Sequence, residues 1–149
     1  MNEVLSMIVA VQILCDDLHY RSKGNSFYAL HLLADRVKDG LDKDLDALRE
    51  AYYLGEKNIE PPCTCEIFRT GIAKVDAIRQ NIVCDGVDMN KCLVLRLKDA
   101  VHILFCYIET IKGASNDGIM TSGTVSILDG IASKMLVAHG LLDRSGLAA

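Results

Sequence analysis

Apolar residues recur at three- and four-residue steps along most of the chain, which is the period of an amphipathic α-helix. The pattern predicts four long helices, over about residues 3–20, 27–54, 87–112 and 122–143. Pro61 and Pro62 break the chain after the second helix, and residues 63–82 then look only partly helical. The pattern therefore predicts an all-α four-helix bundle, with a long crossover carrying a short helix between the second and third helices.

Length and composition fit one domain over residues 1–149. The chain is 50% hydrophobic and 24% charged, which is enough for a sizeable core. The apolar residues near the amino terminus follow Glu3 without a basic segment and keep a helical period, so we expect a core helix and not a signal peptide. Because no continuous run approaches the roughly 20 apolar residues that span a bilayer, we expect a soluble, cytoplasmic protein with no membrane partner.

Two pairs of potential metal ligands lie in the predicted second helix. His31 and Asp35 are four residues apart, as are Asp46 and Glu50, so each pair shares one face of a helix. At 100° per residue all four would fall within a stripe about 100° wide. Asp35 and Asp46, however, would be roughly 16 Å apart along one helix, whereas metal–ligand bonds are only about 2 Å long. The spacing therefore predicts a site shared between two chains of a twofold dimer.

The apolar stripe of the same helix shows where the four ligands would face. Its residues centre roughly 120° from the ligand stripe, so the ligands are expected on a flank of the bundle and not in its core. These residues are Leu30, Ala34, Val37, Leu41, Leu45, Leu48 and Tyr52. A simpler interpretation stays open, in which Asp46 and Glu50 belong to an ordinary solvated face with Lys43 and Arg49.

Residues 19–50 resemble the ferroxidase motif of the mini-ferritins related to the DNA-binding protein from starved cells, the Dps family. The spacings of 12, 4, 11 and 4 residues between the ligand positions match the family throughout. Tyr20 stands where the family usually has Trp. Outside this fifth of the chain the resemblance is loose, at Leu54-Gly55 and Gly123-Thr124. The matching residues are His19-Tyr20, Gly24, Phe27, Leu30-His31, Asp35, Asp46 and Glu50.

The resemblance implies a ferritin-like bundle that binds Fe(II), oxidises it with hydrogen peroxide or dioxygen, and stores ferric mineral in a hollow, usually twelve-chain shell, which protects against oxidative stress. His31 and Asp35 would be the ligands from one chain, and Asp46 and Glu50 those from the other, at a mononuclear or dinuclear iron site in the dimer interface. His19 would be a further ligand or a donor beside the metal. The alternative is a shell-forming or interaction protein whose metal site is structural or vestigial, for example a zinc site.

Charge argues against the DNA binding that the family name suggests. With 16 basic and 20 acidic residues the net charge is −4, and the terminal segments, which begin Met-Asn-Glu and end Leu-Ala-Ala, carry no cluster of Lys or Arg. We expect duplex DNA to be repelled unless Arg21, Lys23 and their copies form a local patch.

Six cysteines and two further histidines remain. Cys63 and Cys65 could form a thiol metal site or a redox pair, although this spacing is too short for a relaxed disulfide between them. The alternative is that all six cysteines are reduced structural thiols. His102 and His139 are interpreted as single histidines with core or surface roles.

Overall fold

The computed structural model describes residues 1–114 and 120–146, and these residues form helices joined by short connections. A single 3₁₀ turn, Gly24–Ser26, precedes the second helix, and the segment η2 is π-helical. The longer elements are α1 (Asn2–Arg21), α2 (Phe27–Lys38), α3 (Leu41–Leu48), η2 (Arg49–Lys57), α4 (Thr64–Asn81), α5 (Met89–Ala114) and α6 (Ser122–Asp143).

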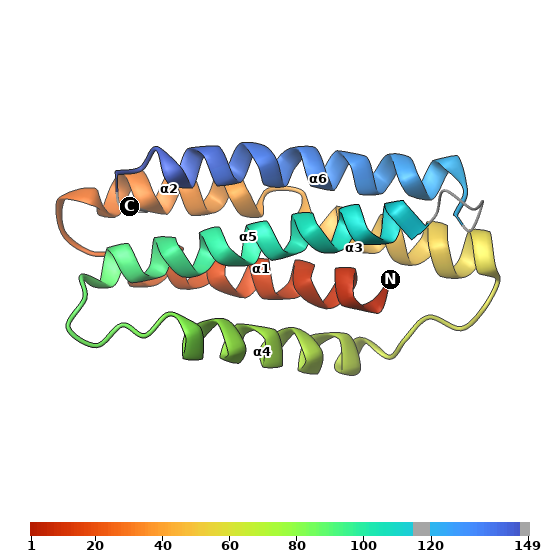
Figure 1. The fold of residues 1–149 in the computed structure, drawn as a ribbon, viewed down its shortest axis with the longest axis horizontal. Coiled ribbons are helices and arrows are strands. Elements are labelled where there is room, and N and C mark those ends of the chain that lie inside the picture. Colours follow the sequence, from red (N-terminus) through yellow and green to blue (C-terminus); the bar gives the residue numbers. More distant parts are fainter. Residues whose placement is uncertain (115–119, 147–149) are drawn as a thin grey trace.

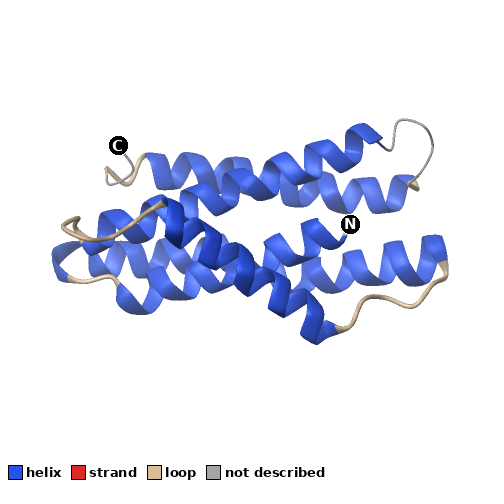
Figure 2. Ribbon diagram, turned by 60° about the horizontal axis from the view of Figure 1, so that its bottom comes forward, coloured by secondary structure: helices blue, strands red, loops and turns tan. Residues whose placement is uncertain are grey.

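Four rods lie side by side: α1, the consecutive segments α2, α3 and η2, then α5, and α6 (Figure 1). The first and last rods run in one direction and the other two run in the opposite direction. The helix α4 lies outside these four, between η2 and α5 in the chain, and crosses α1 diagonally (Figure 2). The all-helical class and the bundle are therefore as predicted.

The core is made by the apolar stripes of all four rods and by one face of α4. Leu5, Leu48, Leu97 and Leu128 are all fully buried, so each rod contributes to one continuous core. The helix α4 approaches α1 closely at Gly71, where an added Cβ would lie 2.7 Å from Val9 Cγ1. A larger residue at this position would force the two helices apart.

The predicted continuous helix over residues 27–54 is wrong, because the rod is interrupted at Gly40. This glycine has φ +78°, in the left-handed region, and it ends α2 in the way that glycines commonly end helices. Leu41 is nevertheless fully buried, as is Leu48, so α3 resumes with its apolar side on the same core. An angular count from His31 to Asp46 in uniform 100° steps therefore does not hold across the break.

The other predicted elements need smaller corrections. The structure places α1, α5 and α6 within two residues of the predicted ends. The crossover contains the complete 18-residue helix α4 where a short, partly formed helix was predicted. Tyr52 is only half-buried, whereas the other six residues of the predicted apolar stripe are buried.

Among the described helices, α6 is long and apolar enough to cross a membrane by length and composition, with a window of mean hydropathy 1.4. Only 33% of that window is buried. The sequence predicted no segment long and apolar enough to span a bilayer, and α6 is an exception to this prediction by length and composition. Core helices of bundles have the same composition. In the structure α6 packs along α5 and also contacts α2 and α3.

Candidate metal centre

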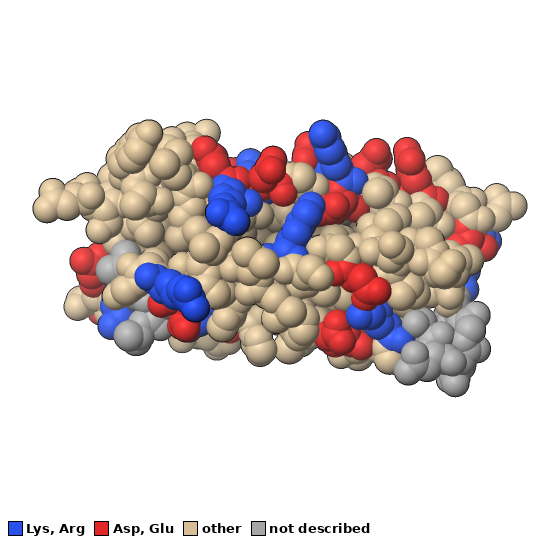
Figure 3. All heavy atoms as spheres, turned by 90° about the horizontal axis from the view of Figure 1, so that it is seen from above, with Lys and Arg blue, Asp and Glu red and all other residues tan. Residues whose placement is uncertain are grey.

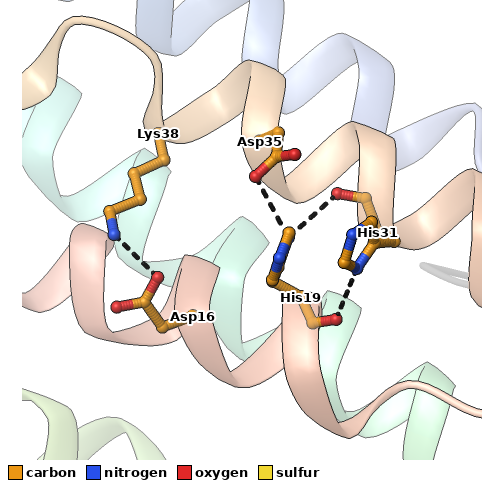
Figure 4. A network of polar contacts seen from close by, with 5 residues as sticks. All are labelled: Asp16, His19, His31, Asp35 and Lys38. Atoms are coloured by element: carbon orange, nitrogen blue, oxygen red, sulfur yellow. Dashed lines mark hydrogen bonds and ion pairs between the residues drawn. The ribbon is translucent and has the colours of Figure 1, made fainter.

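Three of the five predicted ligands meet where the end of α1 lies against α2. His19 belongs to the last turn of α1, and His31 and Asp35 are one turn apart on α2 (Figure 4). The imidazole rings of the two histidines stack with their centroids 3.5 Å apart. The Nδ1 atom of His19 lies 3.0 Å from Asp35 Oδ1. We call these three residues the histidine cluster.

Contacts with oxygen atoms determine which nitrogen of each imidazole ring carries the proton. His31 Nδ1 lies 2.9 Å from the backbone oxygen of His19, and a carbonyl oxygen can only accept, so His31 Nδ1 carries a proton. His19 Nδ1 faces Asp35 Oδ1 and, at 3.4 Å, the backbone oxygen of His31, so it donates as well. In the neutral ring of His31 the Nε2 lone pair is then left for a metal, which is how protein contacts commonly orient histidine ligands. His19 would release its Nδ1 proton when one ion binds both His19 and Asp35.

The histidine cluster fits a divalent cation. One ligand atom from each of His19, His31 and Asp35 can be chosen so that all lie within 4.8 Å of one another. Ligands at about 2.1 Å from an octahedral ion are separated by about 3 to 4 Å, so the three ligand atoms are near the required spacing. The stacked rings of His19 and His31 would have to turn apart for both to point at one ion. Asp35 is exposed and His19 is largely covered, with side-chain exposures of 60% and 16%. The cluster is therefore anchored on the protein side and open on the other.

A cavity of about 600 Å³ adjoins the cluster and reaches Asp35. Four carboxylate side chains line it, and its other walls come from α1, α2 and α4. Lys38 donates a 2.8 Å hydrogen bond to Asp16, and this bond is the main cause that raises the pKa of Lys38 (Figure 4). The carboxylate of Asp16 is thus paired with the ammonium group of Lys38. The acidic residues are Asp16, Asp35, Asp39 and Asp42.

Asp46 and Glu50 do not join the histidine cluster. They lie beyond the break at Gly40, on α3 and at the start of η2, and both are exposed. Among the described residues, only the histidine cluster already has three potential ligand atoms within 4.8 Å of one another. That a second chain supplies Asp46 and Glu50 to the site stays a prediction. We call Asp46 and Glu50 the acidic pair.

The segment that carries Glu50 is tied to α6 by a neighbouring carboxylate. Glu56 of η2, whose side chain is only 7% exposed, accepts a hydrogen bond from the backbone N–H of Thr121, the N-cap residue of α6. Burial by itself would raise the pKa of Glu56, but the hydrogen bonds from Thr121 and Thr124 and the positive charge of Lys57 together outweigh it, and the pKa is lowered. The ionised Glu56 therefore holds η2 against the beginning of α6.

The cysteines differ in part from the expectation of six reduced thiols. Cys84 and Cys92 form a disulfide that joins the α4–α5 connection to α5. Cys63 and Cys65 are free and exposed at the beginning of α4, and Cys63 has a lowered pKa because backbone N–H groups at this helix end favour its thiolate. Burial raises the pKa of Cys15, which is inert in the core.

His102 and His139, interpreted as unrelated single histidines, face each other across α5 and α6 with ring centroids 6.0 Å apart. Cys106 lies one turn from His102, with its Sγ atom 3.5 Å from His102 Nε2. Two sequence signals were available for this group: His102 and Cys106 are four residues apart, and so are His139 and Asp143.

The fold and the histidine cluster define a helical bundle with a candidate cation site at one end of its α1–α2 contact. Comparisons of the chain with protein-family models, with curated proteins and with solved structures found no match.

Proposed function

We propose that this chain is a ferroxidase of the mini-ferritin kind, which binds Fe(II), oxidises it, and stores the ferric product in a shell of identical chains. The observation that carries the proposal is the convergence of His19, His31 and Asp35, three ligands at the motif positions, beside an acidic cavity. Imidazole and carboxylate ligands in an open site suit Fe(II), and carboxylate oxygens also stabilise Fe(III).

The course of the chain supports a ferritin-like arrangement. Two antiparallel helical hairpins, α1 with α2–η2 and α5 with α6, are joined by a long connection that contains α4 (Figure 1). Ferritin-like bundles with one long crossover connect two helical hairpins in the same way, which supports the proposal.

The acidic pair requires a second chain to complete the site. Asp46 and Glu50 are exposed, and among the described residues their side chains form neither a hydrogen bond nor an ion pair, although the backbone oxygen of Asp46 accepts from Arg49. A twofold-related copy that runs antiparallel would bring its acidic pair to the open side of the histidine cluster, and the same contact would form a second site. Each dimer would therefore hold two equivalent iron sites.

The exposed apolar surface is consistent with assembly. Tyr28 and Leu32 on α2 are 71% and 49% exposed, and Leu136 and Val137 on α6 are 58% and 55% exposed. On the face over α6, Lys and Arg side chains are interspersed with Asp and Glu among broad uncharged areas (Figure 3). Large exposed apolar residues on neighbouring helices are typical of surfaces that contact other chains.

In the proposed reaction the histidine cluster and the acidic pair bind Fe(II) and hold it while an oxidant approaches. Two Fe(II) ions lose one electron each, and one hydrogen peroxide takes up both electrons and two protons to give two water molecules. In the metal-free chain Asp35 orients His19 through its Nδ1 proton, which would leave when one ion binds both residues. The acidic cavity concentrates cations near the site by its charge.

The proposal is tested by adding anaerobic Fe(II) and then hydrogen peroxide while the absorbance of the ferric product is recorded. The wild-type chain should oxidise Fe(II) faster than buffer alone, consume two Fe(II) per peroxide, and keep the ferric product soluble. A variant with His31→Ala and Asp35→Ala should lose this acceleration.

Wild-type protein that binds Zn²⁺ at these residues without accelerating Fe(II) oxidation would instead support the structural or vestigial metal site. The mass of the assembly in solution would show whether a twelve-chain shell forms.

A further inference from the structure

We propose a second cation site on the face formed by α5 and α6, in which His102, Cys106 and His139 bind Zn²⁺. None of these residues belongs to the histidine cluster, and the inference does not depend on the proposed ferroxidase function. They are the pair of facing histidines and the thiol that lies one turn along α5.

The register of the two helices brings the ligands together. Lys98 on α5 forms a 2.7 Å ion pair with Asp143 on α6. Because α5 and α6 are antiparallel, one turn further along α5 and one turn back along α6 places His102 opposite His139. The two helices are packed along their length, so this pairing is set by the fold and not by flexible side chains alone.

The distance between sulfur and nitrogen already matches a tetrahedral zinc site. Bond lengths of about 2.3 Å for Zn–S and about 2.0 Å for Zn–N place the two ligand atoms about 3.5 Å apart at the tetrahedral angle. Cys106 Sγ and His102 Nε2 are 3.5 Å apart. The same contact serves as a hydrogen bond in the metal-free chain, and the thiol proton would leave when the metal binds.

His139 can complete the site if its side chain turns toward His102 and Cys106. Two imidazoles on one tetrahedral ion have ring centroids about 5 Å apart, which follows from the same Zn–N bond length. The centroids of His102 and His139 are 6.0 Å apart and the three ligand atoms do not all lie within 4.8 Å of one another, so the ring of His139 must move closer when the metal binds. Both rings line a cavity of about 280 Å³, which also contains Asp99 and leaves room for the movement and for a water molecule as fourth ligand.

The donor set selects the metal. One thiolate and two imidazoles favour Zn²⁺ over Fe(II), because affinity rises along this metal series and sulfur is a soft ligand. The histidine cluster, in contrast, offers a carboxylate and no thiol. Cys106 and His102 are exposed and His139 is half-buried, so a cation can reach the site from solvent.

Titration of the metal-free protein with Co²⁺, used in place of Zn²⁺, tests the site. Thiolate bound to Co²⁺ gives a charge-transfer band in the near ultraviolet, which the histidine cluster cannot produce because it has no sulfur. We expect one Co²⁺ per chain to give this band and Zn²⁺ to abolish it by displacement. Cys106→Ser should remove the band, and His139→Gln should weaken binding by about 10- to 100-fold.

The control is a Cys63→Ser, Cys65→Ser variant, which removes the other exposed thiols and should keep the band at full intensity. Absence of the band in the wild-type chain would overturn the proposal. It would also be overturned if the band persisted in Cys106→Ser, or if it were lost in the Cys63→Ser, Cys65→Ser variant. Helical circular dichroism of each variant verifies that the bundle is folded.

Discussion

The histidine cluster and the acidic pair, the two halves of the proposed iron site, are held in different ways. His19, His31 and Asp35 contact one another through hydrogen bonds and ring stacking within one chain. The acidic pair is exposed on α3 and η2, beyond the left-handed Gly40. The folding of one chain thus orders one half of the ligands, while assembly would have to order the other half.

This difference has an energetic reason. Two carboxylates held close together without a cation repel each other, and burying them within one chain would cost free energy. Histidines can instead satisfy one nitrogen with a backbone carbonyl and still offer the other to a metal. Each chain therefore folds without bringing the acidic pair against Asp35, and the metal would be needed only where two chains meet.

Removal of the two carboxylates of the acidic pair should have the largest effect, which is on the rate of Fe(II) oxidation. We expect a variant with Asp46→Asn and Glu50→Gln to lose Fe(II) oxidation by more than about 100-fold, because two carboxylate ligands are lost. Its free energy of unfolding should change by less than about 0.5 kcal/mol, since both residues are exposed. Stopped-flow absorbance after addition of peroxide, together with urea unfolding, measures the two quantities.

The matched control is Asp76→Asn with Glu60→Gln, which changes the net charge equally at two other exposed positions. It should keep the wild-type rate. If the control lost as much activity as the test variant, overall charge and not metal ligation would explain the result.

Substitution on the buried side of the same rod should instead change the free energy of unfolding. Leu48→Ala removes a fully buried side chain between the two acidic residues and should lower the free energy of unfolding by about 2 to 5 kcal/mol. Leu54→Ala, at a residue 56% exposed, should change it by less than about 0.5 kcal/mol. Equal effects in urea unfolding would show that α3 does not face the core as described.

Loss of the hydrogen bond between Glu56 of η2 and Thr121 should have a smaller effect on the free energy of unfolding, and this effect should depend on pH. Glu56 has a lowered pKa, so its ionised form stabilises the fold above its ordinary value of 4.5, and this contribution is lost as the pH falls through the lowered pKa. We expect Glu56→Gln to cost about 1 kcal/mol at pH 7, because a charged hydrogen-bond acceptor becomes neutral. The difference from the wild-type chain should shrink below about pH 4.5.

Urea unfolding at both pH values measures this difference, with Glu60→Gln, an exposed carboxylate outside this contact, as control. A penalty for Glu56→Gln that stayed constant down to pH 3 would contradict the assignment of the charge to this hydrogen bond.

Helical periodicity predicted most of the bundle and placed His31 and Asp35 on one face, because both depend on contacts that repeat along a helix, whereas His19 was placed only by the resemblance to the mini-ferritin motif. His31 and Asp35 are one turn apart, and the short connection after α1 brings His19 beside them. The break at Gly40 was missed because the apolar period continues through it, and a glycine inside a helix costs only about 1 kcal/mol.

Other features could not be predicted from local patterns. The π-helical geometry of η2 has no distinctive residue preference to reveal it. The approach of His102 to His139 depends on the register between α5 and α6, which the Lys98–Asp143 ion pair marks in the structure. Contacts between distant segments set these features, and a single sequence does not specify them locally.

A proposed iron site that takes ligands from two chains can be restored by mixing two inactive variants. One variant carries His31→Ala and Asp35→Ala, and the other carries Asp46→Ala and Glu50→Ala. In a mixed dimer the intact acidic pair of the first meets the intact histidine cluster of the second, so one of its two sites is complete. Random co-assembly makes half of the dimers mixed, so about a quarter of the wild-type Fe(II) oxidation should return. If mass measurement shows mixed assemblies and the mixture stays as inactive as the separate variants, the shared site is contradicted.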